Sequence, residues 1–486
     1  MTTFDLVVKG GTVATAADVF TADIGVTAGR IAALGHDLAG ARTIDATDKL
    51  VLPGGVDSHC HIEQLSAAGV MNADSFESAT ASAARGGTTT VIPFAAQHVG
   101  TSLADVAADY HARAERGAIV DYALHLILAD PRPEILDDEL PPLVEAGHGS
   151  LKIFLTYDNI RLDDEQALAV FEAARRHGLM VCVHAENHAM IAWLRRRLVE
   201  RGYGDARYHA VSHPRHGEAE AVHRAIALAR LFDQPVMIFH VSTVEALDEI
   251  RRARAAGVKV WAETCTHYLA LTRDALARDD GRGAEWICSP PLREPHDQDA
   301  LWRALADGTL ATVSSDHAPY AADATGKYQA GDAPAFTQVP NGLPGLALRL
   351  PLLFDAMVSR RGMALTDFVD LTATAPARIY NLQHAKGSIA IGKDADLAIW
   401  DPTRRVTLAH ALAGDATGYT PFEGLEVQGW PVTTLRRGET VVENGEVMAA
   451  PGSGRFLPRR GGEAAQPSGR PVAEMDAARN FGAELV

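Results

Sequence analysis

LPGGVDSHCHIE, residues 52–63, closes an apolar run and places His59 and His61 two positions apart at its end. Side chains of a β-strand alternate between its two faces, so these two imidazoles point to the same side. Two imidazoles on one face of a strand end can bind one metal ion. Taken alone, the pair also fits two surface histidines, and the rest of the chain decides between the two interpretations.

Apolar strand candidates alternate with amphipathic helices over residues 55–385. The strand candidates are VLPGGVDSH, TTTVIPF, DYALHLILA, SLKIFLTY, LMVCVHAE, PVMIFHVS, VKVWAETC and ATVSSDHA. One intervening stretch, TVEALDEIRRARAAG, stops on Gly257, as is typical of a helix C-terminus. Eight strands that alternate with helices predict a (β/α)8 barrel, whose active site lies at the carboxyl ends of the strands.

Further side chains suited to ligation come at the ends of strands four, five, six and eight of this series. They are Lys152, His184, His240 and Asp316. Structural histidines scattered by chance would not all fall at one end of the strand set. The sequence therefore predicts a metal centre at the mouth of the barrel.

The two ends of the chain have a different character from the middle. Residues 1–54 and 387–450 read as short strands and turns, and neither piece has enough strands to bury both faces. We expect them to combine into one small β-sandwich beside the barrel of residues 55–386. The Gly-, Pro- and Arg-rich segment 451–486 is expected to be an extended tail, either loosely ordered or in contact with a neighbouring subunit.

Composition excludes several other classes of protein. The chain has 486 residues, 47% hydrophobic and 22% charged, as is ordinary for a soluble enzyme. A net charge of −17, from 45 basic and 62 acidic residues, argues against a nucleic-acid or anionic-membrane surface. The sequence shows no secretory pattern and no membrane-spanning run. Its four cysteines lack CxxC spacing, so we expect a reduced cytoplasmic protein.

With these motifs in view, the chain resembles the amidohydrolase superfamily and, within it, the cyclic-amidase branch of hydantoinases and dihydropyrimidinases. The resemblance covers about residues 4–450. It rests on VVKGGTV, LPGGVDSHCH, GGTTTVIPF, SLKIFLTY, VCVHAEN, AETCTHYL, TVSSDHA, PNGLPG and GKDADLAIWDP. The two histidines and the strand-eight aspartate mark the superfamily. The spacing from Lys152 to Tyr157 and the segment Pro340-Asn341-Gly342 mark the branch.

The resemblance implies a binuclear metal centre, with zinc as the expected metal. It assigns His59, His61 and Asp316 to one ion, and His184 and His240 to the other. A lysine ammonium cannot bind a cation, and the resemblance implies that Lys152 is carboxylated on its amine by carbon dioxide, so that the carbamate bridges both ions. From the residues alone, Lys152 could also be a structural lysine.

Catalytic and substrate-binding roles follow from the same resemblance. A hydroxide shared by the two ions would attack the amide carbonyl, with Asp316 as ligand and general base. Tyr157 would donate to the developing oxyanion. Backbone groups of Ser289 and Asn341 would pair with the imide edge, although turn formation alone also explains both residues. We interpret His188, His213 and His216 as surface or structural residues and leave His267 open.

The expected activity is hydrolytic ring opening of a hydantoin or dihydropyrimidine to an N-carbamoyl amino acid. Allantoinase, dihydroorotase and cyclic-imide hydrolase activities remain alternatives on this scaffold. A non-catalytic scaffold protein of the same fold is a further alternative, which the complete set of ligand residues disfavours. The resemblance also implies a homo-oligomer, with a tetramer expected, and a small cyclic amide as the binding partner.

Overall fold

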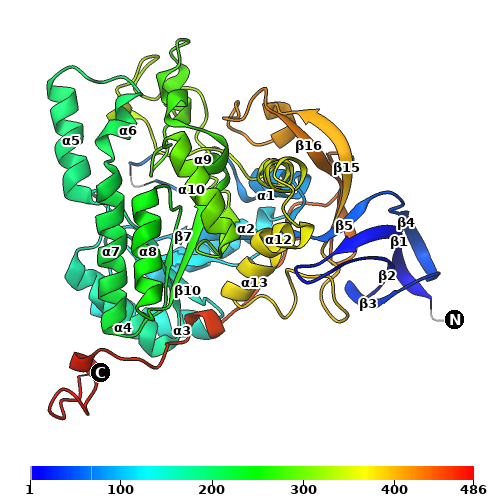
Figure 1. Cartoon of the computed structure of the whole chain (residues 1–486), viewed down its shortest axis with the longest axis horizontal. Coiled ribbons are helices and arrows are strands. Elements are labelled where there is room, and N and C mark those ends of the chain that lie inside the picture. Colours follow the sequence, from blue (N-terminus) through cyan, green and yellow to red (C-terminus); the bar gives the residue numbers. More distant parts are fainter. Residues whose placement is uncertain (1–2, 67, 486) are drawn as a thin grey trace.

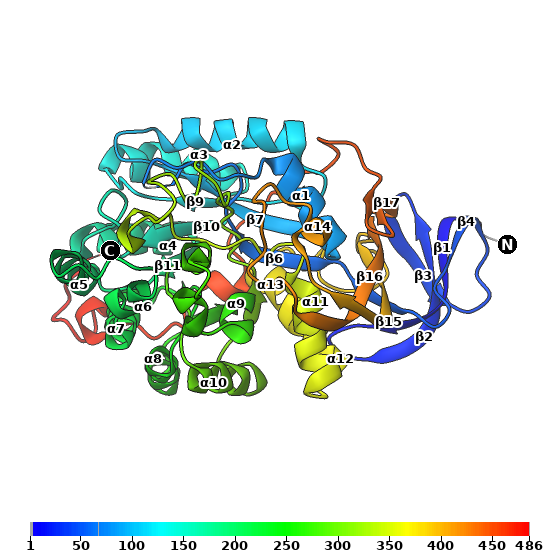
Figure 2. The ribbon, with the colours of Figure 1, turned by 90° about the horizontal axis from the view of Figure 1, so that it is seen from above.

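The computed structural model describes residues 3–66 and 68–485, and the four remaining residues lie outside the described part. At its centre, parallel strands form a nearly closed barrel, with helices around the outside (Figures 1 and 2). The barrel strands are β6 (Gly55–Cys60), β7 (Thr88–Ala96), β9 (His125–Ile127), β10 (Ser150–Phe154), β11 (Met180–His184), β12 (Val236–Ile238), β13 (Val260–Cys265) and β14 (Thr312–Ser314). A short strand, β8 (Asp121–Tyr122), also pairs with β7. The predicted barrel is confirmed.

The barrel closes between its first and last strands through a buried arginine. Arg349 is fully buried and donates from one guanidinium nitrogen to the carbonyls of Val56 and Val313, at 3.3 and 3.0 Å. Beyond the strand ends, the His61 amide donates to the His317 carbonyl at 2.6 Å. These bonds bring β6 and the segment after β14 side by side.

Helices follow the strands as the periodicity predicts. The longer ones are α1 (Phe76–Arg85), α2 (Leu103–Gly117), α4 (Asp164–His177), α5 (His188–Glu200), α7 (Arg215–Leu231), α8 (Val244–Ala255) and α10 (Pro295–Ala306). Helix α8 shows both expected end signals, because the Thr243 side chain caps its N-terminus and Gly257, at φ +82°, follows its C-terminus. Shorter helices complete the shell: α3 (Leu140–Glu145), α6 (Tyr208–Ser212), α9 (Thr266–Ala270), α11 (Arg349–Phe354), α12 (Leu365–Val369), α13 (Ala375–Ile379) and α14 (His410–Ala413).

A second sheet lies beside the barrel and is built from both ends of the chain (Figure 1). Its strands run in the order β18 (Glu446–Val447), β17 (Glu439–Glu443), β16 (Glu426–Arg436), β15 (Leu397–Thr407), β5 (Leu50–Pro53), β1 (Phe4–Ala14), β2 (Val19–Thr27) and β3 (Arg30–Gly35), with β4 (Gly40–Asp45) beside β1. Strand β5 joins the two ends, because it pairs with β1 on one side and β15 on the other. Their apolar side chains share one small core separate from that of the barrel.

Two details of the sequence prediction were wrong. Residues 51–59 were expected to form one strand, but the chain leaves the second sheet after β5 and enters the barrel as β6. The change falls at Gly54, where a Cβ atom would collide with the Thr89 side chain, so only glycine fits. Lys152 was expected at a strand end, but it is the third residue of β10 and lies inside the barrel.

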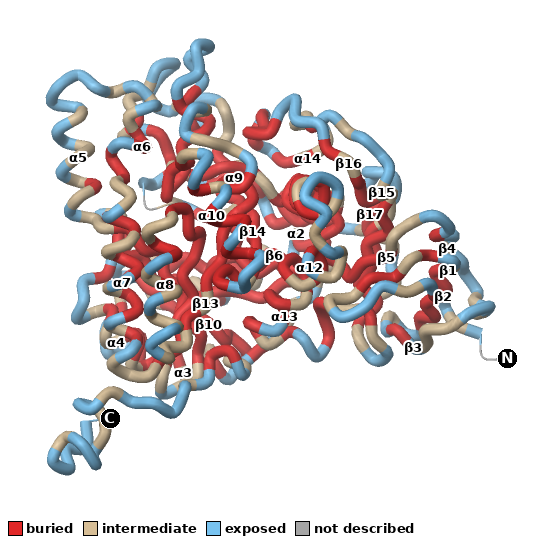
Figure 3. The backbone as a smooth tube through the Cα atoms, in the orientation of Figure 1, coloured by how far each residue is buried: buried red, intermediate tan, exposed pale blue. Residues whose placement is uncertain are grey.

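The tail runs along the base of this chain's own barrel. The Tyr122 amide donates to the Arg455 carbonyl at 2.9 Å, and the Leu457 amide donates to the Tyr122 carbonyl at 2.7 Å. The Arg459 guanidinium is buried and donates to Ser150 Oγ at 2.7 Å. The segment up to about residue 466 therefore covers the end of the barrel opposite the predicted site, and the chain beyond it is largely exposed (Figure 3).

A buried lysine joins the barrel base to the second sheet. Lys386 Nζ lies 2.6 Å from Asp121, 2.7 Å from Asp396 and 3.0 Å from Asp394. Its ammonium fills the centre of this acidic cluster, which could otherwise hold a metal ion. Burial disfavours the charged lysine, but the three carboxylates outweigh burial and raise its pKa.

We predict that Lys386→Met lowers the free energy of unfolding by about 3–5 kcal/mol, because it leaves buried carboxylates without their cation. Urea unfolding followed by circular dichroism measures the change. Lys49→Met is the control, since the pair of Lys49 and Asp401 is partly exposed and contributes less than about 1 kcal/mol. Equal losses in the two variants would contradict a special role for the Lys386 cluster.

Candidate metal centre and active site

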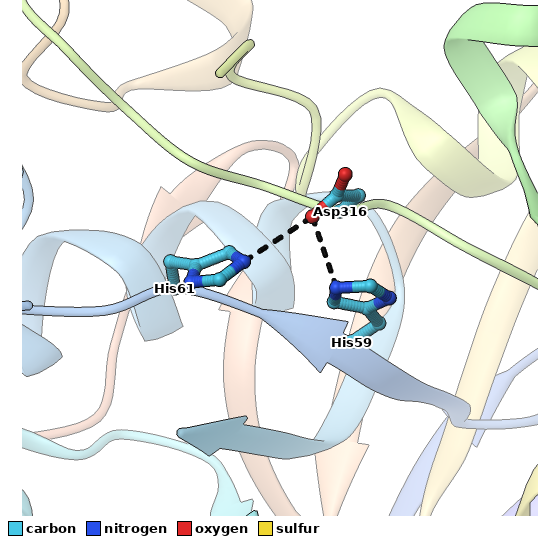
Figure 4. A group of neighbouring side chains, drawn as sticks. All are labelled: His59, His61 and Asp316. Atoms are coloured by element: carbon cyan, nitrogen blue, oxygen red, sulfur yellow. Dashed lines mark ion pairs between the residues drawn. The ribbon is translucent and has the colours of Figure 1, made fainter. Parts of the chain in front are cut away.

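Two histidines at the end of the first barrel strand, His59 in β6 and His61 just after it, meet the aspartate that follows the last strand. His59 Nε2 lies 3.0 Å and His61 Nε2 lies 3.3 Å from the same oxygen of Asp316 (Figure 4). Burial opposes ionisation of Asp316, but His59 and His61 hold the pKa of its carboxyl well below the usual range. The group thus offers two imidazole nitrogens and a carboxylate within the reach of one cation.

A second pair of histidines lies beside this group. The rings of His184, the last residue of β11, and His240, two residues after β12, are 4.4 Å apart between centroids. The ring of His240 is also 5.4 Å from that of His59. Both His240 and Asp316 have positive φ, at +41° and +45°, a backbone conformation that is uncommon outside glycine and frequent at functional sites.

Lys152 rises into the same space without a polar partner. It is completely buried, its Nζ has no hydrogen-bond acceptor, and the rings of Phe239 and Phe154 lie 4.2 and 4.7 Å from that atom. Burial lowers the pKa of Lys152 to about 8. An orphaned amine beside four histidines and a carboxylate fits a residue that is modified and ligated, and it does not fit a structural ion pair.

The ring nitrogens that face away from this space are held by side chains that sequence reasoning missed. The Nδ1 atoms of His59 and His61 contact Glu263 Oε1 and Gln64 Oε1, the latter at 2.8 Å. These contacts fix the proton on Nδ1 and leave Nε2 free to bind a cation, as at metal sites generally. The signal for Glu263 was a carboxylate inside the apolar strand VKVWAETC, and the contact depends on closure of the barrel.

Glu186 holds the third ring in the same way. Its Oε2 lies 2.8 Å from His184 Nε2, which leaves Nδ1 of His184 toward the cavity. Burial raises the pKa of Glu186, but the charge of His213 and the hydrogen bond to His184 outweigh it and bring the pKa to about 2. The sequence signal that could have identified Glu186 is its position two residues after His184 in the segment HAE.

Tyr157 stands over the cavity beside the residues predicted to hold substrate. It has φ +76° and lies three residues after β10, with its ring 5.3 Å from that of His184. The side chains of Ser289 and Asn341 are hydrogen-bonding neighbours of its hydroxyl, and burial raises the pKa of Tyr157. The hydroxyl therefore keeps its proton at neutral pH and can act as a donor.

A buried lysine connects the two loops that carry these residues. Lys327 Nζ donates to the carbonyl of Ile287 at 2.8 Å and to that of Pro340 at 2.9 Å. Ser289 and Asn341 follow these carbonyls closely in the chain, so Lys327 fixes the spacing between them. Ser289 is held further by a hydrogen bond from its hydroxyl to Glu186, at 2.6 Å.

All nine residues predicted for the site line one cavity at the mouth of the barrel. They are His59, His61, Lys152, Tyr157, His184, His240, Ser289, Asp316 and Asn341. Of the other histidines, His213 is buried and bonded to Ser212, whereas His216 is exposed. His267, which was left open, is buried close to Asp316 on the side of Cys265. The cysteines are all buried and unbonded to each other.

Comparison with known proteins agrees with this geometry. The profile of the Amidohydrolase family matches residues 50–441. The D-hydantoinase of Ralstonia pickettii is 40% identical over 458 residues, which cover 94% of this chain and 99% of the relative. The D-hydantoinase of Geobacillus stearothermophilus is 38% identical over 456 residues, which cover 93% of this chain and 96% of the relative. The crystal structure of dihydropyrimidinase from Brevibacillus agri NCHU1002 matches with a TM-score of 0.91 and 37% identity, over 94% of this chain and 99% of the other.

The barrel and its ligand-bearing strand ends thus define a member of the amidohydrolase family. Within it, the chain belongs to the hydantoinases and dihydropyrimidinases, to which it is similar along nearly its whole length. Among the residues that the structure describes, no helix has both the length and the apolar character needed to cross a membrane.

Proposed function

We propose that the protein hydrolyses an amide bond in a hydantoin or dihydropyrimidine ring and releases an N-carbamoyl amino acid. Water supplies its oxygen to the carbonyl carbon and its proton to the ring nitrogen, and the bond between those two ring atoms breaks. One observation carries this proposal: the six ligand-type side chains, the Tyr157 hydroxyl and the pair of Ser289 and Asn341 line a single cavity.

The side chains fit a pair of divalent cations. His59, His61 and Asp316 would hold one ion, His184 and His240 would hold the other, and Lys152 as its carbamate would bridge them. Two such ions would lower the pKa of a water molecule and polarise the substrate carbonyl. The pKa of Lys152, about 8, supports the carbamate, because only the unprotonated amine forms a bond to the carbon of carbon dioxide, with loss of a proton.

The protein's own groups complete the reaction. Asp316 contacts both His59 and His61, and there its carboxylate can accept the proton of the attacking water and pass it to the leaving ring nitrogen. Tyr157, kept protonated by burial, donates to the oxyanion as charge develops on it. Ser289 and Asn341 orient the imide edge of the ring, at a spacing that Lys327 maintains.

Several finer points stay predictions that rest on resemblance. They are the choice of zinc, a homotetrameric assembly and a cytoplasmic location. Allantoin, dihydroorotate and cyclic imides remain alternative substrates of the same chemistry. A non-catalytic scaffold role is disfavoured, because every predicted ligand side chain faces the cavity.

The proposed function is tested by metal analysis combined with a substrate panel. We expect close to two divalent ions per chain, ring opening of hydantoin, phenylhydantoin or dihydrouracil, and loss of that activity on chelation with recovery on re-addition of the metal. Allantoin, dihydroorotate and succinimide test the alternatives. A preparation that is fully active with one ion or none contradicts the binuclear proposal, and inactivity on the whole panel with two ions bound contradicts the proposed reaction.

We predict that Lys152→Ala loses metal and activity together, because the bridging group disappears. Short-chain carboxylic acids such as propionate should partly restore both, since a free carboxylate can occupy the position of the carbamate. Metal content and hydrolysis rate are measured with and without the acid. Lys49→Ala, at a partly exposed lysine, is the control and should respond to neither treatment. Two bound ions and a normal rate in Lys152→Ala would show that the lysine is only structural.

Tyr157→Phe is predicted to keep its metal but to turn over about 10²–10³-fold more slowly, the usual effect of removing one oxyanion donor. The loss should appear equally in kcat and kcat/KM, because the hydrogen bond strengthens only in the transition state. Tyr203→Phe, at an exposed tyrosine, serves as the control and should match the wild type. A rise in KM at constant kcat would make Tyr157 a ground-state contact, and no change at all would make it a packing residue.

A further inference from the structure

Arg195 is a positively charged residue at the mouth of the cavity that the proposed reaction does not use. It lies on α5, the helix that follows β11, and its half-buried side chain lines the cavity together with Thr337 and Val339. The same side chain lines a small adjoining pocket formed with Asp158 and His188. Arg195 therefore lines both the cavity that holds the ligand side chains and the pocket beside it, together with Tyr157 and Asn341.

The guanidinium of Arg195 is not neutralised by the protein. Within the described part of the chain, no carboxylate lies within 4.0 Å of it, and its hydrogen bond goes to the Thr337 carbonyl at 3.0 Å. Its neighbours Arg196 and Arg197, in contrast, both pair with Glu200. A guanidinium carries five N–H donors, so most of the donors of Arg195 remain open to the cavity and to solvent.

The surrounding groups leave this charge uncompensated. The nearest acidic side chain of the adjoining pocket, Asp158, lies 3.3 Å from His188 and is exposed. The pKa values of His188 and His213 are lowered, mainly by burial, and the charge of Arg195 acts in the same direction. Arg161 also acts on His188 in this direction, so the region beside the cavity is positively charged on a protein whose net charge is −17.

The position of Arg195 relative to the ring site defines what it can bind. A ring held at the ligand end, with its imide edge on Ser289 and Asn341, has only the outward part of the cavity for its exocyclic substituent. Outside the ligand set, the described lining of the cavity is apolar or neutral, with Phe154, Ile160 and Val339 among its residues, and Arg195 is its one charged side chain. An arginine fork pairs best with a planar carboxylate, to which it can donate two parallel hydrogen bonds.

We propose that Arg195 forms a subsite for a carboxylate on the exocyclic arm of the cyclic amide, so that the preferred substrates are rings with a carboxyalkyl substituent and the products are N-carbamoyl derivatives of acidic amino acids. This inference rests on the proposed function, because it concerns the arm of the same substrate.

The experiment compares two matched substrates with metal-loaded enzyme: carboxyethyl-hydantoin and its neutral isostere, carbamoylethyl-hydantoin. We expect the wild type to favour the acid by about tenfold or more in kcat/KM, the effect of a charge-assisted hydrogen bond. Arg195→Gln should reduce this ratio to about one, and Arg195→Lys should retain part of it. Arg196→Gln, which removes a charge one residue away on the outer surface, should leave the ratio unchanged.

Ionic strength provides a second measurement that needs no variant. In the wild type, the preference for the acid should fall as salt is raised from about 20 to 500 mM, because a partly exposed ion pair is screened. A wild type that hydrolyses both arms equally well, or a ratio that survives Arg195→Gln while both rates fall, would overturn the subsite and make Arg195 a tether between α5 and the Asn341 loop. Failure to hydrolyse any hydantoin would instead contradict the proposed function itself.

Discussion

Buried charge is the constraint on which this structure depends. Asp316 and four histidines lie at the mouth of the barrel and Lys152 lies inside it, where a buried charge without a partner is costly. The carboxylate is satisfied by His59 and His61, but the amine of Lys152 faces phenylalanine rings. In the proposed centre, two cations and a carbamate would resolve this imbalance, so that one set of groups accounts for both metal binding and chemistry.

The rest of the barrel serves to bring these groups together. Asp316 can reach His59 and His61 only if the first and last strands meet, and polar contacts inside the protein hold these two strands together. Arg349 joins Val56 to Val313, and Asp57 accepts a hydrogen bond from the Ser315 amide at 3.2 Å. Because Asp57 and Ser315 each lie next to the site in sequence, the contacts that close the barrel also align His59 with Asp316.

The sequence predicted the site residues that follow from local strand patterns, but it did not predict the contacts that form only when the barrel closes. The period of two residues placed His59 and His61 on one side, and the series of strands placed Asp316 near them. The contact of Glu263 with His59 joins residues 204 positions apart across the barrel, and although a carboxylate inside an apolar strand marks Glu263, neither segment identifies the other as its partner. Likewise, the Thr89 side chain approaches Gly54, the residue at which segment 51–59 divides between two sheets, only in the folded chain.

The groups proposed for catalysis and those proposed for substrate selectivity lie on different parts of the barrel. The predicted ligand side chains lie on or just after strands, whose positions are set by the sheet, whereas the arm of the proposed substrate would meet loops and a helix, which vary more freely. Arg195 connects the two regions, because its hydrogen bond to Thr337 holds α5 against the segment that leads to Asn341. A carboxylate bound by Arg195 would therefore contact the same guanidinium that helps to position Asn341, which is proposed to bind the ring. In the proposed complex, binding of the carboxylate arm and orientation of the scissile amide would thus be physically coupled through residues 337–341.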